Sequence, residues 1–527
     1  MMPRWGRSLP IFVFTSSLGL ALLPAAAGCD KTNPDDFQPP VRDAQARDTG
    51  SDAGEVGPEE VTFPQGFLWG SATSAFQTEK GIAHADWSKW VTQDPPKIKR
   101  GEKPDVGGPD SLNHIDDDVR ALKESGQNAY RFSIEWARIY PTRESFDKDL
   151  PDGNALAVYD GLLTKLRAAG ITPLVTLVHF SLPDYLATAG QTGWEDPSAV
   201  ALFTTYAERM AARFKDKVDD WVTINEPLVV AISGYIAGVH PPGAVGQTAR
   251  AFKVAQIQAR AHARAYDAIH RVDTVSAAGP DAGGVAARVS VAAHLRTFHA
   301  ENPDNAEDVS AAKRIEYVWN RWFLDAIVKG DWDDDFDGKL DGPNDKRADP
   351  ELVRRADYIG INYYSDTLVS TTGSPKIPGL DVALSEANLN TGRAKTDVRW
   401  DIYPEGLRTV LLAAKDYGLP LLITENGLAD ASDKNRPRFL AEHIYQAGWA
   451  MQQGVPLLGY FHWSLVDNFE WESGYCPKFG LFSYDPNTGA RTARPSASAY
   501  RGIITAGKLR RETLASFPAY ATPTFCE

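Results

Sequence analysis

The sequence predicts an α/β protein, a single (β/α)8 barrel with extended loops after its strands. Short apolar runs alternate with longer stretches of helical periodicity, which is the order of elements in a parallel barrel. The chain has 527 residues, of which 43% are hydrophobic and 14 are tryptophan. A barrel of this kind takes roughly 250 residues and can exceed 400 with insertions. Two of the apolar runs end in a glutamate before a turn signal, as expected where a barrel presents carboxylates at the C-terminal ends of its strands.

Eight strands are expected, at residues 68–72, 129–135, 172–179, 220–225, 288–293, 358–363, 421–425 and 458–463. The start of the fifth is the least clearly marked, because the segment 277–285 before it is rich in glycine. Apolar residues at helical spacing predict helices at 157–169, 199–214, 251–271, 407–417 and 436–454. A barrel formed by these elements gathers the C-terminal ends of all its strands on one face, so residues remote in sequence share one pocket.

The N-terminus has the features of a secretory signal. Arg4 and Arg7 precede an apolar run at 9–23, and small residues follow up to Cys29, which predicts a signal peptide over residues 1–28. The cysteine directly after the small residues resembles that of a bacterial lipoprotein signal, in which it becomes the lipidated first residue. This resemblance implies an exported, membrane-anchored lipoprotein in the periplasm or at the cell surface. The alternative is an ordinary signal peptide and a secreted soluble protein.

The rest of the chain is divided by composition into a linker, the barrel and a tail. Residues 29–60 are rich in Asp, Glu, Pro, Gly and Ser and cannot bury enough apolar surface to offset their ordering entropy, so a disordered linker is expected. Residues 61–505 are assigned to the barrel and residues 506–527 to a C-terminal tail. The formal charge of −14 argues against a nucleic-acid partner. No further apolar stretch is long enough to span a membrane, so membrane contact is expected only through the lipid anchor. The oligomeric state is left open.

Two glutamates indicate the chemistry. Glu226 comes after the apolar run at 221–224 and one asparagine, and Glu425 comes directly after the run at 421–424. A pair of facing carboxylates is the machinery of glycoside hydrolysis, with one as acid/base and the other as nucleophile or base. A single glutamate after a strand is as well explained as a solvated turn residue, but two in similar motifs favour the catalytic interpretation.

Further motifs occur in the order of a known family. They read FLWGSATSAFQ at 67–77, YRFSIEW at 130–136, LVHF at 177–180, DYIGINYY at 357–364 and GYFHWSLVDNFEW at 459–471. With the two glutamate motifs, they make residues 63–500 resemble a family 1 glycoside hydrolase, a β-glucosidase-type retaining enzyme. The resemblance implies an exo-acting enzyme that releases the terminal non-reducing β-D-glucosyl residue of short, non-phosphorylated substrates such as cello-oligosaccharides or aryl β-glucosides.

The resemblance also implies roles for single residues. Glu425 corresponds to the nucleophile and Glu226 to the acid/base, with Arg131 and Tyr364 beside the nucleophile and Asn225 at the sugar 2-hydroxyl. The cation of Arg131 is expected to favour the ionised form of Glu425, whose charge in turn raises the pKa of Glu226.

The same motifs imply a sugar-binding set. It consists of Gln77, His179, Phe180, Trp463, Glu470 and Trp471, with His294 on the leaving-group side. Sugar hydroxyls pair with amide, imidazole and carboxylate groups, and the C–H faces of the ring pack on indole. Glu470 stands where relatives that cleave phosphorylated sugars have serine, and a carboxylate would repel a phosphate dianion. Two alternatives stay open: a β-galactosidase or β-fucosidase of the same family, and a non-catalytic sugar-binding lipoprotein.

An acidic segment suggests a metal site, although the expected chemistry requires no cofactor. Residues 333–341 have the D-x-D-x-D-G spacing of a calcium loop, with Asp333, Asp335, Asp337 and Asp341 as candidate ligands of a structural Ca²⁺ ion. Asn344 stands at the twelfth position in place of a bidentate glutamate, and a solvated acidic loop is the alternative.

The chain has three cysteines. If Cys29 carries lipid, Cys476 and Cys526 are left, and an exported protein permits them to pair. Such a bridge would hold the tail against the face that carries the glutamates. Two unpaired thiols are the alternative.

Overall fold

The strands that the sequence predicts close into one parallel barrel. The structure, a computed structural model, describes residues 56–186, 193–277, 286–385 and 391–526. The barrel strands are β2 (Leu68–Ala72), β3 (Ala129–Ser133), β4 (Thr172–Val178), β5 (Asp220–Asn225), β6 (Arg288–His294), β8 (Ile359–Tyr363), β11 (Leu421–Asn426) and β12 (Leu457–Trp463). Each is hydrogen-bonded to the next in this order, and β12 pairs with β2 to close the ring. The fold class is therefore confirmed, and no strand departs from its expected bounds by more than two residues.

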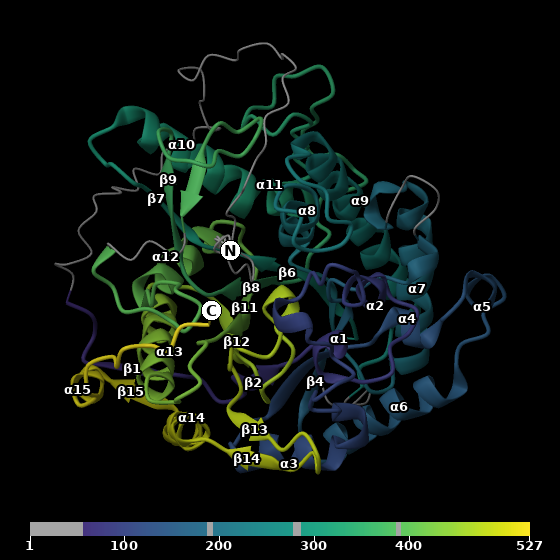
Figure 1. The fold of residues 1–527 in the computed structure, drawn as a ribbon, viewed down its shortest axis with the longest axis horizontal. Coiled ribbons are helices and arrows are strands. Elements are labelled where there is room, and N and C mark those ends of the chain that lie inside the picture. The colour runs from purple at the N-terminus through teal and green to yellow at the C-terminus, as the bar shows by residue number, and fades with distance from the viewer. Residues whose placement is uncertain (1–55, 187–192, 278–285, 386–390, 527) are drawn as a thin grey trace, which may run out of the picture.

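Helices surround the barrel, as Figure 1 shows. The longer ones are α3 (Ile115–Glu124), α6 (Gly153–Ala168), α7 (Ser198–Phe214), α9 (Thr248–Val272), α10 (Ala306–Glu316), α12 (Pro404–Lys415), α13 (Arg436–Gln452) and α14 (Pro495–Ala506). All five expected helices are among them. In α7 the buried residues Phe203, Tyr206 and Met210 recur at helical spacing, so one apolar stripe packs on the core.

Shorter elements lie in the loops and near the ends of the chain. The helices of this kind are α1 (Ala75–Thr78), α2 (Asp86–Trp90), α4 (Trp136–Ile139), α5 (Arg143–Asp147), α8 (Pro227–Tyr235), α11 (Trp322–Leu324) and α15 (Arg511–Ala515). The strands are β1 (Glu60–Thr62), β7 (Thr297–Ala300), β9 (Asp366–Ser370), β10 (Ala383–Ser385), β13 (Phe482–Tyr484), β14 (Arg491–Ala493) and β15 (Lys508–Arg510). A separate three-stranded sheet of β7, β9 and β10 is built from segments after β6 and β8, so it belongs to the extended loops.

The inside of the barrel is packed with side chains. One buried layer consists of Ala129, Leu174, Val222, Ala292, Tyr358, Leu422 and Phe461. Gly70 on β2 makes room for this layer, because a Cβ at position 70 would lie 2.5 Å from the ring of Phe461. The packed interior leaves the loop-covered face at the strand ends as the place for a site.

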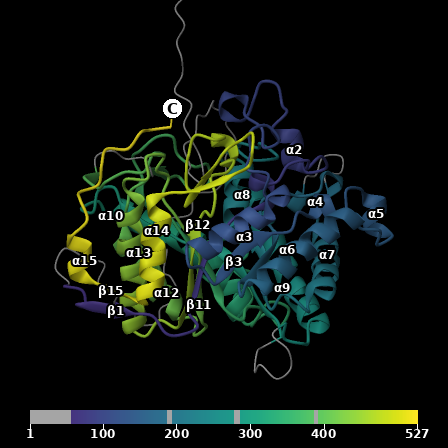
Figure 2. The same cartoon turned by 90° about the horizontal axis from the view of Figure 1, so that it is seen from below.

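A strand near the N-terminal end of the described chain pairs with a strand of the C-terminal tail, far from that face. β1 and β15 pair antiparallel, with Glu60 opposite Arg510, and Figure 2 shows them at the other end of the molecule from the C-terminus. β1 begins at Glu60, the last residue of the expected linker, and β15 and α15 lie in the expected tail. The predicted signal peptide, Cys29 and the linker up to residue 55 lie outside the described residues. In the described part of the chain, no helix is long and apolar enough to cross a membrane.

Candidate active site

Two glutamates at the C-terminal ends of barrel strands face a common cavity. Glu425 is the fifth residue of β11, and Glu226 directly follows β5. Each is 3% exposed. The cavity holds about 410 Å³ of space, counting its opening to solvent. Its wall consists of His179, Phe180, Asn225, Glu226, His240, Tyr364, Trp400, Glu425, Trp463, Glu470, Trp471 and Phe479.

Glu425 is held between a cation and a phenol. Nη1 of Arg131 donates to its Oε1 at 2.6 Å, and the hydroxyl of Tyr364 donates to its Oε2 at 2.6 Å. Arg131 lies on β3 and is 1% exposed. Its remaining nitrogens donate to Thr176 Oγ1 at 3.0 Å and to Asn225 Oδ1 at 2.7 Å, so the guanidinium is fixed on three sides. Donors to both carboxylate oxygens favour the ionised form of Glu425.

Glu226 has different neighbours. Its Oε1 accepts a hydrogen bond of 2.8 Å from Nδ2 of Asn362 on β8. Asn362 also donates to Asn225 Oδ1 at 3.0 Å and accepts from Thr424 Oγ1 at 2.6 Å, so its amide orientation is fixed. The partner of Glu226 is thus a neutral amide, whereas that of Glu425 is a guanidinium.

The pKa values of the two carboxyls follow from these neighbours. Burial, reinforced by the negative charge of Glu425, raises the pKa of Glu226 to about 8. Burial also raises the pKa of Glu425, but Arg131 and Tyr364 oppose that rise. Glu226 is therefore the carboxyl that holds a proton near neutral pH, and Glu425 is the one kept ionised.

Three residues of the wall have backbones in the left-handed region, namely Phe180 with φ of 69°, Glu226 with 45° and Trp471 with 50°. Non-glycine residues rarely adopt this conformation, which costs roughly 1–3 kcal/mol each and clusters at functional sites. The N–H of Glu226 donates to the carbonyl of Ala292 on β6 at 2.7 Å, and this bond anchors the turn from β5 into α8. The neighbouring strand thus helps to hold the strained turn that aims Glu226 at the cavity.

The loop after β12 supplies a second polar group on the wall. Nε1 of Trp463 donates to Oε1 of Glu470 at 3.1 Å, and Nε2 of Gln77 donates to its Oε2 at 3.3 Å. Gln77 also donates to the carbonyl of Phe469 at 2.8 Å, so it holds this loop, and its role in sugar binding stays a prediction. Burial raises the pKa of Glu470 to about 8. Near neutral pH this carboxyl can therefore donate as well as accept hydrogen bonds.

His179 contributes a neutral imidazole to the wall. Its Nε2 lies 3.1 Å from Nδ2 of Asn225, and its ring stacks on that of Trp471 with centroids 6.1 Å apart. Burial, with the nearby charge of Arg131, lowers the pKa of His179 well below 6.5. A neutral imidazole offers one donor and one acceptor, which suits recognition of hydroxyl groups.

His294 lies beside Tyr364, which is part of the wall. It pairs with Asn362 in the register of β6 and β8, and its ring lies 6.2 Å from that of Tyr364. Within the described chain, both of its ring nitrogens are buried without a hydrogen-bond partner. Burial lowers the pKa of His294 well below 6.5. Its role on the leaving-group side stays a prediction.

Several site residues were not identified from the sequence. His240, Trp400 and Phe479 line the wall, and Asn362 connects the surroundings of the two glutamates. Asn362 lies in the DYIGINYY motif at the end of a predicted strand, and this position is the signal that could have identified it. The other three come from loops without strand or helix periodicity, which offer no such signal.

The acidic loop groups its carboxylates differently from the expected calcium set. Oxygens of Asp333, Asp335 and Asp345 lie within 4.8 Å of one another, and the other two expected ligands are not in this group. Asp345 joins because the chain turns back: its Oδ1 accepts the N–H of Asp334 at 2.8 Å. Asp333 accepts a hydrogen bond of 2.7 Å from the hydroxyl of Tyr317 and two from backbone N–H groups. The carboxylates thus organise the loop's own turn.

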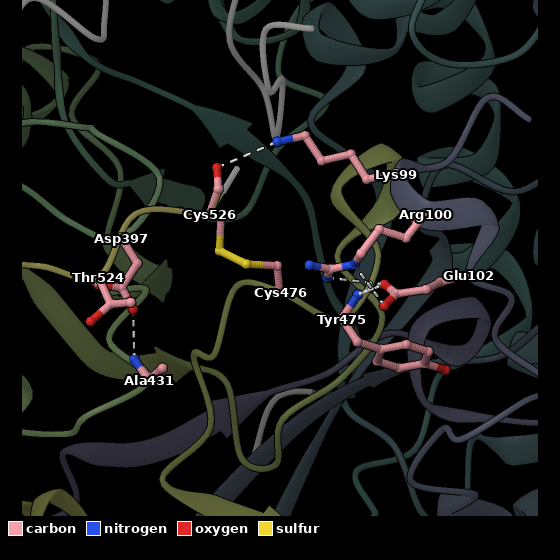
Figure 3. Close-up of a disulfide and its surroundings, with 9 residues drawn as sticks. All are labelled: Lys99, Arg100, Glu102, Asp397, Ala431, Tyr475, Cys476, Thr524 and Cys526. Atoms are coloured by element: carbon pink, nitrogen blue, oxygen red, sulfur yellow. Dashed lines mark hydrogen bonds and ion pairs between the residues drawn. A yellow bond between two sulfur atoms is a disulfide. The ribbon is translucent and has the colours of Figure 1, made fainter. Parts of the chain in front are cut away.

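Of the two alternatives for the cysteines, the structure contains the bridge. Cys476 and Cys526 form a disulfide with their Cα atoms 5.7 Å apart (Figure 3). The bond joins the loop after β12 to the end of the tail, at the face that carries the glutamates.

Known proteins resemble this chain over most of its length. The model of the family described as glycosyl hydrolase family 1 matches residues 59–509. Beta-glucosidase A of Thermotoga maritima is 35% identical over 463 residues, which cover 84% of this chain and 97% of that protein. Beta-galactosidase of Pyrococcus woesei is 31% identical over 506 residues, which cover 84% and 97%. The solved structure of the Thermotoga maritima beta-glucosidase in complex with glucoimidazole superposes with a TM-score of 0.72 at 31% identity, over 85% of this chain and 100% of that one.

Proposed function

Because the chain belongs to glycosyl hydrolase family 1, we propose that this β-glycosidase is a retaining exo-β-glucosidase that acts on short, non-phosphorylated glucosides. The observation that carries the proposal is the unequal pairing of the two buried glutamates. Arg131 and Tyr364 donate to Glu425, whereas Glu226 is bonded to the neutral amide of Asn362. One carboxyl is prepared as an anion and the other as an acid, as double displacement requires.

In the first step an oxygen of Glu425 attacks the anomeric carbon while the proton of Glu226 passes to the departing oxygen. The bond between the anomeric carbon and the departing glycosidic oxygen breaks, and a glycosyl ester forms on Glu425. The negative charge of Glu425 stabilises the positive charge that develops on the ring. Asn225, fixed by Arg131 at 2.7 Å, is the residue that we assign to the 2-hydroxyl.

In the second step the roles reverse. Formation of the ester removes the negative charge of Glu425, so the pKa of Glu226 falls and its carboxylate can take a proton from water. The water oxygen attacks the anomeric carbon, the ester bond breaks, and Glu425 returns as a carboxylate. Two inversions at one carbon leave the β configuration unchanged.

The chemistry of the cavity supports a neutral sugar. Trp463 and Trp471 offer indole faces, and Glu470, His179 and Asn225 offer hydrogen-bonding groups. Of the described residues that form the wall, none is Lys or Arg, so the wall offers none of the cations that usually bind phosphate. The Thermotoga maritima relative was solved with glucoimidazole, which supports a glucose-like ligand in the corresponding cavity here.

A β-galactosidase is the second candidate, with β-fucosidase activity as a variant of it. Beta-galactosidase of Pyrococcus woesei is nearly as similar to this chain as the glucosidases are, and Glu470 can bond a 4-hydroxyl of either orientation. The test is kcat/KM on a panel of aryl β-glycosides that share one leaving group. We expect the glucoside to be the best substrate. A galactoside or fucoside hydrolysed with higher kcat/KM would replace the glucosidase assignment.

We propose further that the enzyme is exported and anchored through lipid on Cys29. The signal-type sequence before Cys29 supports this, and so does the Cys476–Cys526 disulfide, because such bonds persist in oxidising compartments. Cys29→Ser should leave kcat unchanged and release the protein from the membrane fraction or block its processing. A wild-type protein that is soluble after fractionation, with a mature N-terminus other than Cys29, would contradict the anchor.

A further inference from the structure

The end of the chain runs back to the mouth of the active site. Figure 2 shows the yellow segment after α15 leaving the β1–β15 end and passing along α13 to the C-terminus at the opposite end of the barrel. The hydroxyl of Tyr520 donates to Oε2 of Glu442 in the middle of α13 at 2.5 Å. Asn435, just before the first turn of α13, exchanges two hydrogen bonds with Ala521, at 2.7 and 3.0 Å. The tail therefore runs along α13 toward the N-terminal end of that helix.

At the mouth, the last residues of the tail hold a turn of another loop. The N–H groups of Thr524 and Cys526 donate to Oδ1 and to the carbonyl of Asp397, at 3.0 and 2.9 Å. The second carboxylate oxygen of Asp397 accepts the N–H of Ala431 at 2.7 Å. The turn that begins at residue 396 closes on Trp400, through the N–H of residue 396 and the carbonyl of Trp400. Trp400 is part of the cavity wall.

The disulfide holds a second part of the wall. Cys476 lies in the loop that carries Glu470, Trp471 and Phe479, all of which line the cavity. Tyr475, which precedes Cys476, is held by a different loop: its N–H donates to Oε2 of Glu102 at 2.6 Å. Figure 3 shows the sulfur–sulfur bond between this contact and the Asp397 turn.

We propose that residues 524–526, with Cys526 as their main anchor, are a positioning element for sugar binding. They join two loops of the wall, the one with Trp400 and the one with Glu470 and Trp471. Trp463 and His462 of β12 also bond the second loop, and the junction adds a link between it and the first. Loops that are ordered before the ligand arrives lose less conformational entropy on binding. The tail thus improves affinity for the sugar without touching it. The ligand's identity rests on the proposed function, whereas the mechanical effect does not.

The test compares Cys526→Ser and Cys476→Ser with the wild-type enzyme. We expect KM for an aryl β-glucoside to rise about three- to tenfold in both variants, with kcat within about twofold, because ground-state binding is lost and the two glutamates are untouched. Tyr520→Phe is the matched control: it removes a tail hydrogen bond on α13, away from the mouth. It should leave KM at the wild-type value, whatever it does to the melting temperature.

Amide hydrogen exchange without substrate gives a readout that does not depend on the activity. Faster exchange at residues 396–400 and 470–479 in the two cysteine variants is the expected result. If exchange there and KM both stay at wild-type values while the melting temperature falls, the bond is a stabilising staple only and the proposal is overturned. If either variant fails to fold, the folded wild-type protein reduced by dithiothreitol takes its place in both measurements. A protein that does not hydrolyse glucosides at all would refute the proposed function, and the exchange result would still decide this inference.

Discussion

The ends of β5 and β11 present the same side chain in opposite surroundings. Glu226 and Glu425 are equally buried, and burial raises the pKa of both. At β11 the carboxylate receives Arg131 on one oxygen and Tyr364 on the other. At β5 the carboxyl receives one amide, from Asn362, and the repulsion of Glu425. The difference in roles therefore comes from the side chains that other strands of the barrel supply, rather than from the glutamates themselves.

The comparison also shows that the two ends are coupled. Asn225 accepts from Arg131, which holds Glu425, and from Asn362, which holds Glu226. The charge of Glu425 contributes to the raised pKa of Glu226. A substitution at the end of β11 should therefore change the pKa or activity of the group at the end of β5, and the reverse. The sizes of these effects rank the contacts by importance.

The largest effect is expected from Glu425→Gly. Loss of the covalent nucleophile should lower kcat for hydrolysis on the order of 10⁵-fold or more, because only the remaining transition-state contacts are left. The same variant supplied with α-glucosyl fluoride and an acceptor sugar should form a glycoside, since Glu226 can still act as base. Wild-type rates of hydrolysis in this variant would contradict the assignment of Glu425 as the nucleophile.

Glu226→Ala comes next, and its effect should depend on the leaving group. Substrates with poor leaving groups should lose about 10²–10⁴-fold in kcat/KM, because they need a proton from the general acid. Activated aryl glycosides need less help and should lose much less, and added azide should give the β-glycosyl azide. Equal losses on both kinds of substrate would show that Glu226 is not the acid.

Tyr364→Phe should have a smaller effect that acts through Glu425. Removal of a hydrogen bond to a charged group, worth about 1.5–3 kcal/mol, should lower kcat/KM by roughly 10- to 100-fold. The lost donor favoured the ionised form, so the pKa of Glu425 rises and the acid limb of the pH profile moves to higher pH. Tyr363→Phe is the control, because that hydroxyl is also buried but bonds the carbonyl of Tyr403. A matching shift of the acid limb in the control would contradict the account.

The smallest effect is expected from His294→Asn, beside the β5 end. His294 contacts Tyr364 but neither glutamate by hydrogen bond in the described chain. We expect the ranking of leaving groups to change by about two- to fivefold, on the scale of one weak contact, with the pH profile unchanged. A shifted pH profile would instead place His294 in the coupling between the two carboxyls.

Much of the contrast between Glu226 and Glu425 could be predicted from the sequence, because the residues that produce it lie on or directly after barrel strands. Apolar runs located all eight strands, and the motifs at their ends contained Arg131, Asn225, Glu226, Tyr364 and Glu425. Loop geometry could not be predicted, since it depends on contacts between segments far apart in the chain. His240 and Trp400 reach the wall in this way, and the chain reversal that brings Asp345 to the acidic loop has no periodic signal. The course of the tail is a further case. The sequence predicted that a Cys476–Cys526 bridge would hold the tail against the face with the glutamates, but it gave no signal that the tail also bonds the turn at Asp397.

The most direct test of the central claim is the pKa of Glu226 with and without the charge of Glu425. It can be measured by carbon-13 NMR titration of the Glu226 carboxyl, assigned with Glu226→Gln, in the free enzyme and after Glu425 is trapped as a 2-fluoroglucosyl ester. We predict a pKa of about 8 in the free enzyme, and a marked fall once the ester has removed the negative charge. A pKa near the ordinary glutamate value of 4.5 in the free enzyme, or one that does not change on trapping, would contradict the account.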